Sequence, residues 1–231
     1  MIIQKQSHEV LCISQIEHAK LASAILKNLN MYQKLPSTQK SALHTATLYH
    51  DHGWHDYDTN PIYPKNSIIP LDFTQISSTQ HIDIWTKTKL IVKKKSTLIQ
   101  YLICTHNSYL ANIRHSNTIS IKTKKKLTTF LTTQKQLQSN LKQSLIPLYS
   151  ITTLNKLSNL LKLADWISLT ICLNQNITYI NFDTKINIDN YPEIKCSPPL
   201  NNSPHTFSIH ATKLNLKQNT KEKTKITLTF N

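Results

Sequence analysis

The chain has 231 residues and a formal net charge of +15, from 27 lysines and arginines against 12 aspartates and glutamates. It contains one glycine, Gly53, and one arginine, Arg114. Rossmann, P-loop and collagen-like folds are excluded, because each needs several glycines within one motif. Lysine, asparagine and isoleucine are abundant, which is typical of an AT-rich genome, and we interpret the scarcity of glycine as codon drift.

The first half of the chain is predicted to be helical after a short β-hairpin. Ser14 and Glu17 have the spacing of a capping box, in which each side chain accepts the other residue's backbone amide. Gly53 is expected to end a helix in the left-handed conformation. The expected elements are strands at 2–4 and 10–13, helices at 14–29 and 36–53, and a long loop at 54–72.

The second half is predicted to hold further helices and then to change to strands. The expected elements are helices from 77 or 78 to about 90, at 97–114, 120–145 and 152–173, and strands at 177–182, 206–210 and 226–230. The last helix is apolar almost all round, which predicts a place at the centre of a bundle. The fold class is therefore mainly α, with a small antiparallel β appendage from the C-terminal region that the N-terminal hairpin can join. The expected domains are a helical one at 1–174, including the hairpin, and a β-rich extension at 175–231.

The cysteines and the hydropathy pattern bear on the cellular setting. Cys12, Cys104, Cys172 and Cys196 lack CxxC spacing, which is typical of buried thiols in a reducing compartment. The sequence has no stretch of about 18 apolar residues and no signal-peptide pattern. We therefore expect no membrane partner and a cytoplasmic or organelle-stromal location.

Two runs of lysine, within 87–95 and 122–126, carry much of the positive charge. Such runs can bind the phosphates of nucleic acid. Sequence-specific readers favour arginine, however, and this chain has almost none. The runs also fall at helix ends and on exposed faces, so solvated surface is the favoured interpretation and nucleic-acid binding is the alternative.

Residues of metal-ligating type occur at five places, each on a separate predicted helix or helix end. They are His18, the pair His50–Asp51, His81, His106 and Asp165. Imidazole with carboxylate suits metals such as iron, manganese and zinc. Asp165 is the strongest single candidate, because apolar residues flank it and an unpaired carboxylate among them would be costly. A metal ion or a strong hydrogen-bonding partner would compensate that cost.

The order of these residues resembles the HD-domain superfamily of helical metalloenzymes, over roughly residues 14–173. Particular segments also resemble an uncharacterised HD-like family catalogued as a domain of unknown function, with a strand-rich C-terminal part. These segments are Gln15–Leu21 (QxxHAxL), His50–Trp54, Pro70–Phe73, His81–Trp85 and Ala164–Leu169. The resemblance implies an HD-like metal-binding domain and two ions. It implies His18, His50, Asp51 and Asp165 at one ion, with Asp51 bridging, and His81 and His106 at the other.

The same resemblance implies an enzyme with divalent metal, iron or manganese before zinc, magnesium or nickel. A phosphohydrolase acting on a phosphate ester or nucleotide through metal-activated water is favoured. The alternatives are a diiron oxygenase acting on a C–H bond of a small polar substrate, and a non-catalytic or nucleic-acid-binding module. Many HD phosphohydrolases carry a substrate-binding lysine where this chain has Trp54. We therefore expect His52 and Lys162 to serve catalysis beside Asp51, with a small-molecule substrate as partner.

Overall fold

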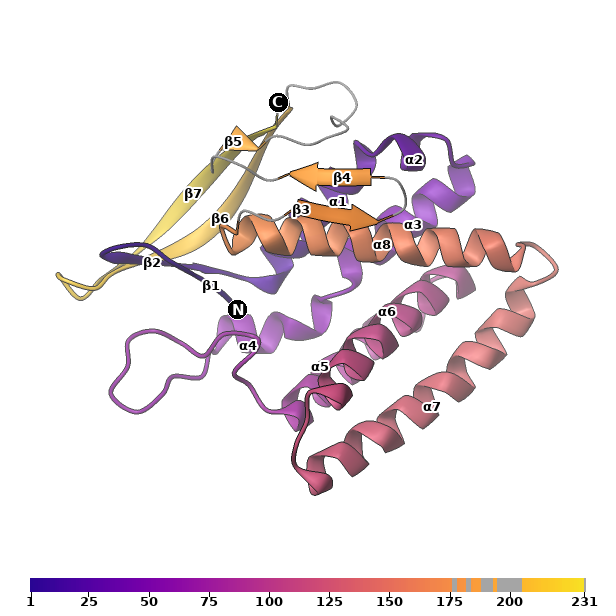
Figure 1. Ribbon diagram of the computed structural model, residues 1–231, viewed down its shortest axis with the longest axis horizontal. Coiled ribbons are helices and arrows are strands. Elements are labelled where there is room, and N and C mark those ends of the chain that lie inside the picture. Colours follow the sequence, from indigo (N-terminus) through magenta and orange to yellow (C-terminus); the bar gives the residue numbers. More distant parts are fainter. Residues whose placement is uncertain (176–177, 182–183, 188–192, 195–204, 231) are drawn as a thin grey trace.

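Helices make up most of the chain, and α8 crosses the middle of the bundle (Figure 1). The computed structural model describes residues 1–175, 178–181, 184–187, 193–194 and 205–230. Its helical elements are α1 (Gln15–Lys27), α2 (Asn30–Gln33), α3 (Ser37–Tyr49), the 3₁₀ helix η1 (His52–Trp54), α4 (His55–Thr59), α5 (Ser78–Val92), α6 (Thr97–Ser116), α7 (Ile121–Leu145) and α8 (Ile151–Cys172). The predicted fold class, mainly α with a β appendage, is confirmed.

Strands from both ends of the chain meet in one sheet of order β1-β2-β6-β7-β5. The strands are β1 (Ile2–Lys5), β2 (Glu9–Ile13), β5 (Glu193–Ile194), β6 (His205–Asn215) and β7 (Thr220–Phe230). The neighbours pair antiparallel except β5, which runs parallel to β7. A separate antiparallel hairpin consists of β3 (Thr178–Asn181) and β4 (Thr184–Asn187). The N-terminal hairpin thus joins the C-terminal strands, as the sequence predicted.

One apolar core joins the sheet to the helices. Helix α8 contacts α1, α3 and α6, and β6 packs against α1. The core cluster contains the fully buried Leu157 and Leu161 of α8 together with Ile13, Leu228 and Phe230 of the sheet. The apolar core thus contains residues from both sides of position 174, and the division into two domains there stays a prediction.

Helix α1 begins as its sequence predicts, but the glutamate of the expected capping box has another role. The Ser14 hydroxyl accepts a hydrogen bond from the Glu17 backbone amide at 3.0 Å. The Glu17 carboxylate accepts one from the backbone amide of His210 in β6 at 2.8 Å, and it pairs with Lys20. The predicted return bond to Ser14 is thus replaced by a link between α1 and the sheet.

The expectation that Gly53 ends a helix in the left-handed conformation is wrong. Helix α3 ends at Tyr49, and Gly53 lies in η1 without a positive φ. The described residues with positive φ are Asn66, Asn174 and Asn219. Asparagine tolerates this conformation better than most residues that carry a β-carbon. In this chain asparagine therefore takes the positions at which glycine is usual.

Gly53 is required instead by the close approach of α5. A β-carbon at this position would lie 2.1 Å from the Ile84 carbonyl oxygen and 2.5 Å from Thr88 Oγ1. The Gly53 amide also donates a hydrogen bond to Thr88 Oγ1 at 3.0 Å. The turn η1 thus lies directly against the backbone of α5, where no side chain fits.

Two short helices, α2 and α4, were not expected from the sequence. Helix α4 lies within the predicted loop at 54–72, so that expectation is wrong for its first residues. Each has only four or five residues, too few to show an apolar periodicity.

The cysteine prediction holds for Cys12, Cys104 and Cys172, which are free and buried. Cys196 and the outer ends of the predicted strand at 177–182 lie outside the described residues. Within the described part of the chain, no helix combines the length and apolar character needed to cross a bilayer.

Candidate metal centre

Four of the predicted ligands come together from separate parts of the chain. His18 lies on α1, His50 and Asp51 follow directly after α3, and Asp165 lies on α8. One nitrogen or oxygen atom from each lies within 4.8 Å of the others. We call these residues the ligand cluster. Its histidines are each 1% exposed, so protein atoms rather than bulk water surround them.

His50 is oriented by the backbone of the helix that precedes it. Its Nδ1 donates a hydrogen bond to the Thr47 carbonyl oxygen at 2.6 Å, since a carbonyl can only accept. In the neutral ring, Nε2 then carries a lone pair. That atom lies 3.2 Å from Asp165 Oδ1 and 3.2 Å from Asp51 Oδ2. Thr47 therefore directs the lone pair of His50 at two carboxylates.

His18 is oriented in the same way by Ser168 of α8. The Ser168 hydroxyl donates its hydrogen to the Asp165 carbonyl oxygen at 2.9 Å. Its oxygen therefore accepts from His18 Nδ1, which lies at 2.9 Å. The Nε2 atom of His18, left with a lone pair in the neutral ring, lies 2.8 Å from Asp165 Oδ1 and 3.7 Å from Asp51 Oδ2.

Lone pairs and carboxylate oxygens at these distances repel one another unless a cation lies among them. A proton on an imidazole is one such cation. Burial alone would lower the pKa of His50, but Asp51 and Asp165 together hold it well above its ordinary value. Burial likewise works to raise the pKa of Asp165, while hydrogen bonds from His18 and His50 hold it well below its ordinary value.

A metal ion is the other cation that fits. Imidazole nitrogens and carboxylate oxygens bind one ion at about 2.0–2.2 Å, which places neighbouring ligand atoms roughly 3 Å apart. The nitrogen–oxygen distances in the ligand cluster, 2.8–3.7 Å, have that spacing. The cluster is therefore a buried His/Asp group that can bind a metal.

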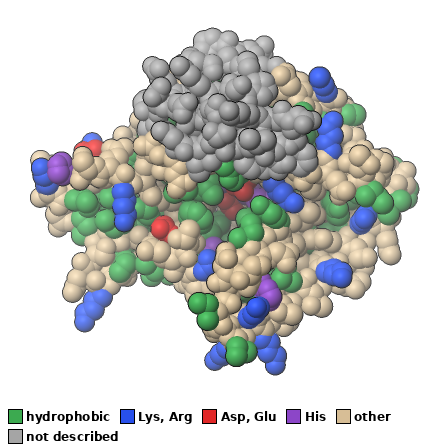
Figure 2. All heavy atoms as spheres, in the orientation of Figure 1, with side chains coloured by type: hydrophobic (Ala, Val, Ile, Leu, Met, Phe, Trp, Pro, Cys, Tyr) green, Lys and Arg blue, Asp and Glu red, His purple; other side chains and the backbone are tan. Residues whose placement is uncertain are grey.

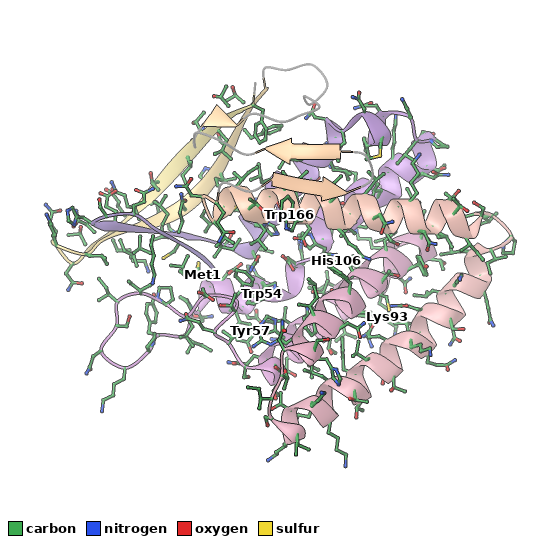
Figure 3. The ribbon with its side chains drawn as sticks, in the orientation of Figure 1. Met1, Trp54, Tyr57, Lys93, His106 and Trp166 are labelled. Atoms are coloured by element: carbon green, nitrogen blue, oxygen red, sulfur yellow. The ribbon has the colours of Figure 1, made fainter. Side chains whose placement is uncertain are left out.

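His106 lies at the edge of the ligand cluster, where α6 runs beside α8 (Figure 3). Its Nε2 is 3.5 Å from Asp165 Oδ2, and its ring centroid is 5.1 Å from that of His50. Both of its ring nitrogens are buried and have no hydrogen-bond partner among the described residues. Burial lowers the pKa of His106 to about 4, so the ring is neutral and carries a free lone pair.

His81 on α5 lies outside the ligand cluster. Its Nε2 donates a hydrogen bond to the Phe73 carbonyl oxygen at 2.8 Å, and its ring contacts those of Trp54 and Trp85. Its Nδ1 is buried with no partner in the described part of the chain. Burial and the charge of Arg114 lower the pKa of His81 to about 4. A second ion held by His81 and His106 stays a prediction.

A cavity of about 480 Å³ opens onto the ligand cluster. His18, Asp51 and Asp165 form part of its wall, and the rings of Trp54 and Trp85 form another part. Figure 2 shows acidic and histidine atoms within a hollow near the middle of this face, beside hydrophobic atoms. A small molecule that enters the cavity therefore meets both the buried ligands and an aromatic surface.

Two residues predicted to serve catalysis lie away from this cavity. The His52 ring stacks on Tyr49, with centroids 4.1 Å apart, and lines a different depression in the surface. Lys162 Nζ lies 4.5 Å from the centre of the Tyr109 ring. Neither is among the described residues that line the cavity, whereas Asp51 is. The structure thus supplies no contact between the cavity and His52 or Lys162.

The structure places Arg114 in the cavity wall, which the ligand pattern did not predict. Its Nε donates a hydrogen bond to Ser78 Oγ at 3.0 Å, and its terminal nitrogens donate to the carbonyl oxygens of Thr74 and Ile76. The sequence did distinguish Arg114 by its rarity, because it is the one arginine among 27 lysines and arginines.

A model of one protein family matches residues 1–229. The chain belongs to this family, described as "Protein of unknown function (DUF3891)". The match confirms the predicted resemblance to a domain of unknown function and covers the strands as well as the helices. Comparisons with curated proteins and with solved structures found no match. The DUF3891 description names no reaction, so the chemistry has to be argued from the atoms of the site.

Proposed function

We propose that the protein is a metal-dependent hydrolase that cleaves phosphate esters at the ligand cluster. The observation that carries this proposal is the common orientation of its two histidines. Thr47 and Ser168 fix both Nδ1 atoms as donors, so in the neutral rings, the form that binds a metal, both Nε2 lone pairs face carboxylates. Metal-ligating histidines in proteins are oriented by partners of this kind. The ligand types and their order along the chain also resemble those of HD-domain enzymes.

The unpartnered nitrogens of His106, beside the ligand cluster, and of His81, in the cavity wall, support a second ion or a ligand that hydrogen-bonds to them. A buried ring nitrogen without a partner costs free energy, and a ligand of either kind removes that cost. Mixed imidazole and carboxylate ligands suit iron or manganese. We therefore include these metals, and up to two ions, in the proposal.

When bound, a divalent ion supplies a Lewis acid that lowers the pKa of a coordinated water and withdraws charge from a phosphoryl oxygen. The protein does the rest. Asp51 and Asp165 place negative charge at the cavity wall, and the buried imidazoles keep that charge apart from bulk water. His81 is neutral near pH 7, since burial and the charge of Arg114 lower its pKa to about 4, and its Nδ1 lone pair can accept a hydrogen bond inside the cavity.

A second candidate function is a diiron oxygenase acting on a small substrate, and the aromatic lining of the cavity favours it. Trp54, Phe73 and Trp85 line the cavity beside the ligand cluster. Such a wall excludes water and suits a substrate whose C–H bond is to be oxidised. The two functions share their ligands, so they differ in the reaction and not in the site.

Metal analysis and activity assays on the full chain test the proposal. The protein is purified without oxygen, its metal content is measured, and p-nitrophenyl phosphate and its bis-ester are offered with manganese or iron. We expect bound metal and phosphate-ester cleavage that chelation abolishes. Asp165→Asn, which removes a ligand charge with little change in size, should lower activity by roughly 100-fold or more. The control is Asp83→Asn, the same change on the exposed face of α5.

The outcomes separate the candidates. Two irons with substrate-dependent oxygen uptake and no ester cleavage would replace the hydrolase by the oxygenase. Absence of any bound metal, together with an Asp165→Asn variant as stable as the wild type, would remove the metal site altogether.

A further inference from the structure

Arg114, near the end of α6, reaches across to the segment that precedes and begins α5. Its hydrogen bonds go to Ser78 Oγ and to the carbonyl oxygens of Thr74 and Ile76. A guanidinium has five N–H groups, so these bonds use three of them. The other two have no acceptor among the described residues. The side chain is therefore held in place and still has donors to offer.

The charge of Arg114 is not offset by a carboxylate. Its acceptors are all neutral oxygens, and the ion pairs of the described residues involve other cations. Arg114 is half-buried, and burial lowers its pKa, yet a guanidinium stays charged at any ordinary pH. Asp51 and Asp165 also line the cavity, and a metal ion bound by them would offset their charge. Arg114 is then a fixed cation with no ion-pair partner among the described residues, and it attracts an anion.

Apolar side chains, some of them aromatic, share the cavity wall with Arg114. Leu110 and Ile113, on the same stretch of α6, line the cavity with it, and so do Trp54 and Trp85. His81 lies near Arg114 and the two tryptophans, since its ring contacts both of theirs and the charge of Arg114 lowers its pKa. A ligand that meets the cation therefore also meets aromatic and aliphatic side chains.

The composition of the chain gives an independent reason to single out this residue. Of the 27 lysines and arginines, all except Arg114 are lysine. Lysine offers a point charge, whereas the planar fork of arginine binds two oxygens of a phosphate or carboxylate at once. The one arginine of the chain, Arg114, lies in the wall of the cavity.

We propose that the cavity binds an organic anion, with Arg114 on its phosphate or carboxylate oxygens and Trp54 and Trp85 against its flat apolar body. The proposal deepens the proposed function and rests on it for the statement that this anion is the substrate. The binding itself depends on Arg114 and the wall, and can be measured without turnover.

The probes are benzylphosphonate and phenylacetate, which share one aromatic body and differ in the anionic group. Their binding is measured by calorimetry with the full chain, manganese-loaded and after chelation. Arg114→Lys keeps the charge and loses the fork, and should weaken binding on the order of tenfold. Asn117→Asp adds a charge to the cavity wall and leaves the Arg114 hydrogen bonds in place, and should weaken binding by roughly tenfold. The control is Asn112→Asp, also exposed near the end of α6 but absent from the cavity lining.

Tighter binding of the phosphonate supports a phosphorylated ligand, and tighter binding of the carboxylate supports a carboxylate ligand on the same residue. Arg114-dependent binding without ester cleavage would retain this proposal and remove the hydrolase. Ester cleavage, together with probe binding that neither Arg114→Lys nor Asn117→Asp weakens, would retain the hydrolase and remove this proposal. Failure of the wild type to bind either probe, or an equal loss in Asn112→Asp, would overturn the proposal.

Discussion

Replacing Gly53 by alanine perturbs the closest backbone contact beside the ligand cluster. The added methyl group would lie 2.1 Å from the Ile84 carbonyl oxygen, where ordinary contacts begin at 3.4 Å. The turn η1 must then move away from α5 by roughly 1 Å, which also strains the hydrogen bond from the Gly53 amide to Thr88. Overpacking costs about 1–3 kcal/mol and a lost hydrogen bond about 0.5–1.5 kcal/mol, so we expect a destabilisation of about 2–4 kcal/mol.

The same movement reaches the metal centre, because Asp51 is two residues before Gly53. Asp51 Oδ2 lies 3.2 Å from His50 Nε2, so a displacement of about 1 Å is a large fraction of their separation. Metal content, measured by elemental analysis, should therefore fall more than helix content measured by circular dichroism. The melting temperature reports the stability loss.

Gly53→Asn separates the close approach from a requirement for left-handed backbone. If the backbone angle were the reason for glycine, asparagine would be tolerated better than alanine, as it is at Asn66 and Asn174. The close approach predicts that asparagine is at least as destabilising, because it carries the same β-carbon and more atoms. An alanine variant with an unchanged melting temperature and a full metal load would refute the reasoning.

Three further predictions concern the surroundings of the site and the end of α8. Ser168→Ala removes the acceptor that orients a ligand and should weaken metal binding about 10–100-fold, measured by competition with a chelator. The control is Ser158→Ala, which should leave metal binding unchanged, because this buried α8 serine bonds to Leu154 of its own helix and to no other described residue. In the metal-free protein, the urea concentration at the unfolding midpoint should decrease as the pH is lowered from 6.5 to 4. A midpoint that does not change with pH would contradict this. His81 and His106 have folded pKa values of about 4, so the unfolded chain binds more protons in that window. Asn174 has a φ of 51° where α8 ends, so Asn174→Ala should cost about 1 kcal/mol and Asn174→Gly nothing, as measured by thermal unfolding.

The sequence predicted the long helices because their signals are local. Ser14, for example, caps α1 where its spacing to Glu17 indicates. The role of Gly53 could not be predicted in this way, because the atoms that exclude a side chain belong to α5, some thirty residues later. The hydrogen bond of Glu17 with His210, in place of the expected one with Ser14, could not be predicted for the same reason, since β6 lies at the other end of the chain.

The ligand cluster was predictable from residue type and order, because the order of its residues resembles the His/Asp pattern of HD-domain enzymes. The residues that orient the ligands were not. Serine occurs throughout this chain, so only its contacts distinguish Ser168, and the group that orients His50 is the backbone carbonyl of Thr47, which any residue type would supply. Arg114 falls between these cases, since its rarity was visible and its place in the cavity was not.

The pairing of β2 with β6 has a consequence for the order in which the protein assembles. The pair joins residues such as Val10 and Leu214, which are about two hundred positions apart. A contact of such long range is slow to form, and during synthesis it cannot form before β6 leaves the ribosome. Helix α1, which carries His18, is linked to β6 through Glu17. The helix that carries the first candidate ligand is thus fixed by one of the last strands, so we expect the ligand cluster to be complete only after β6 has been made.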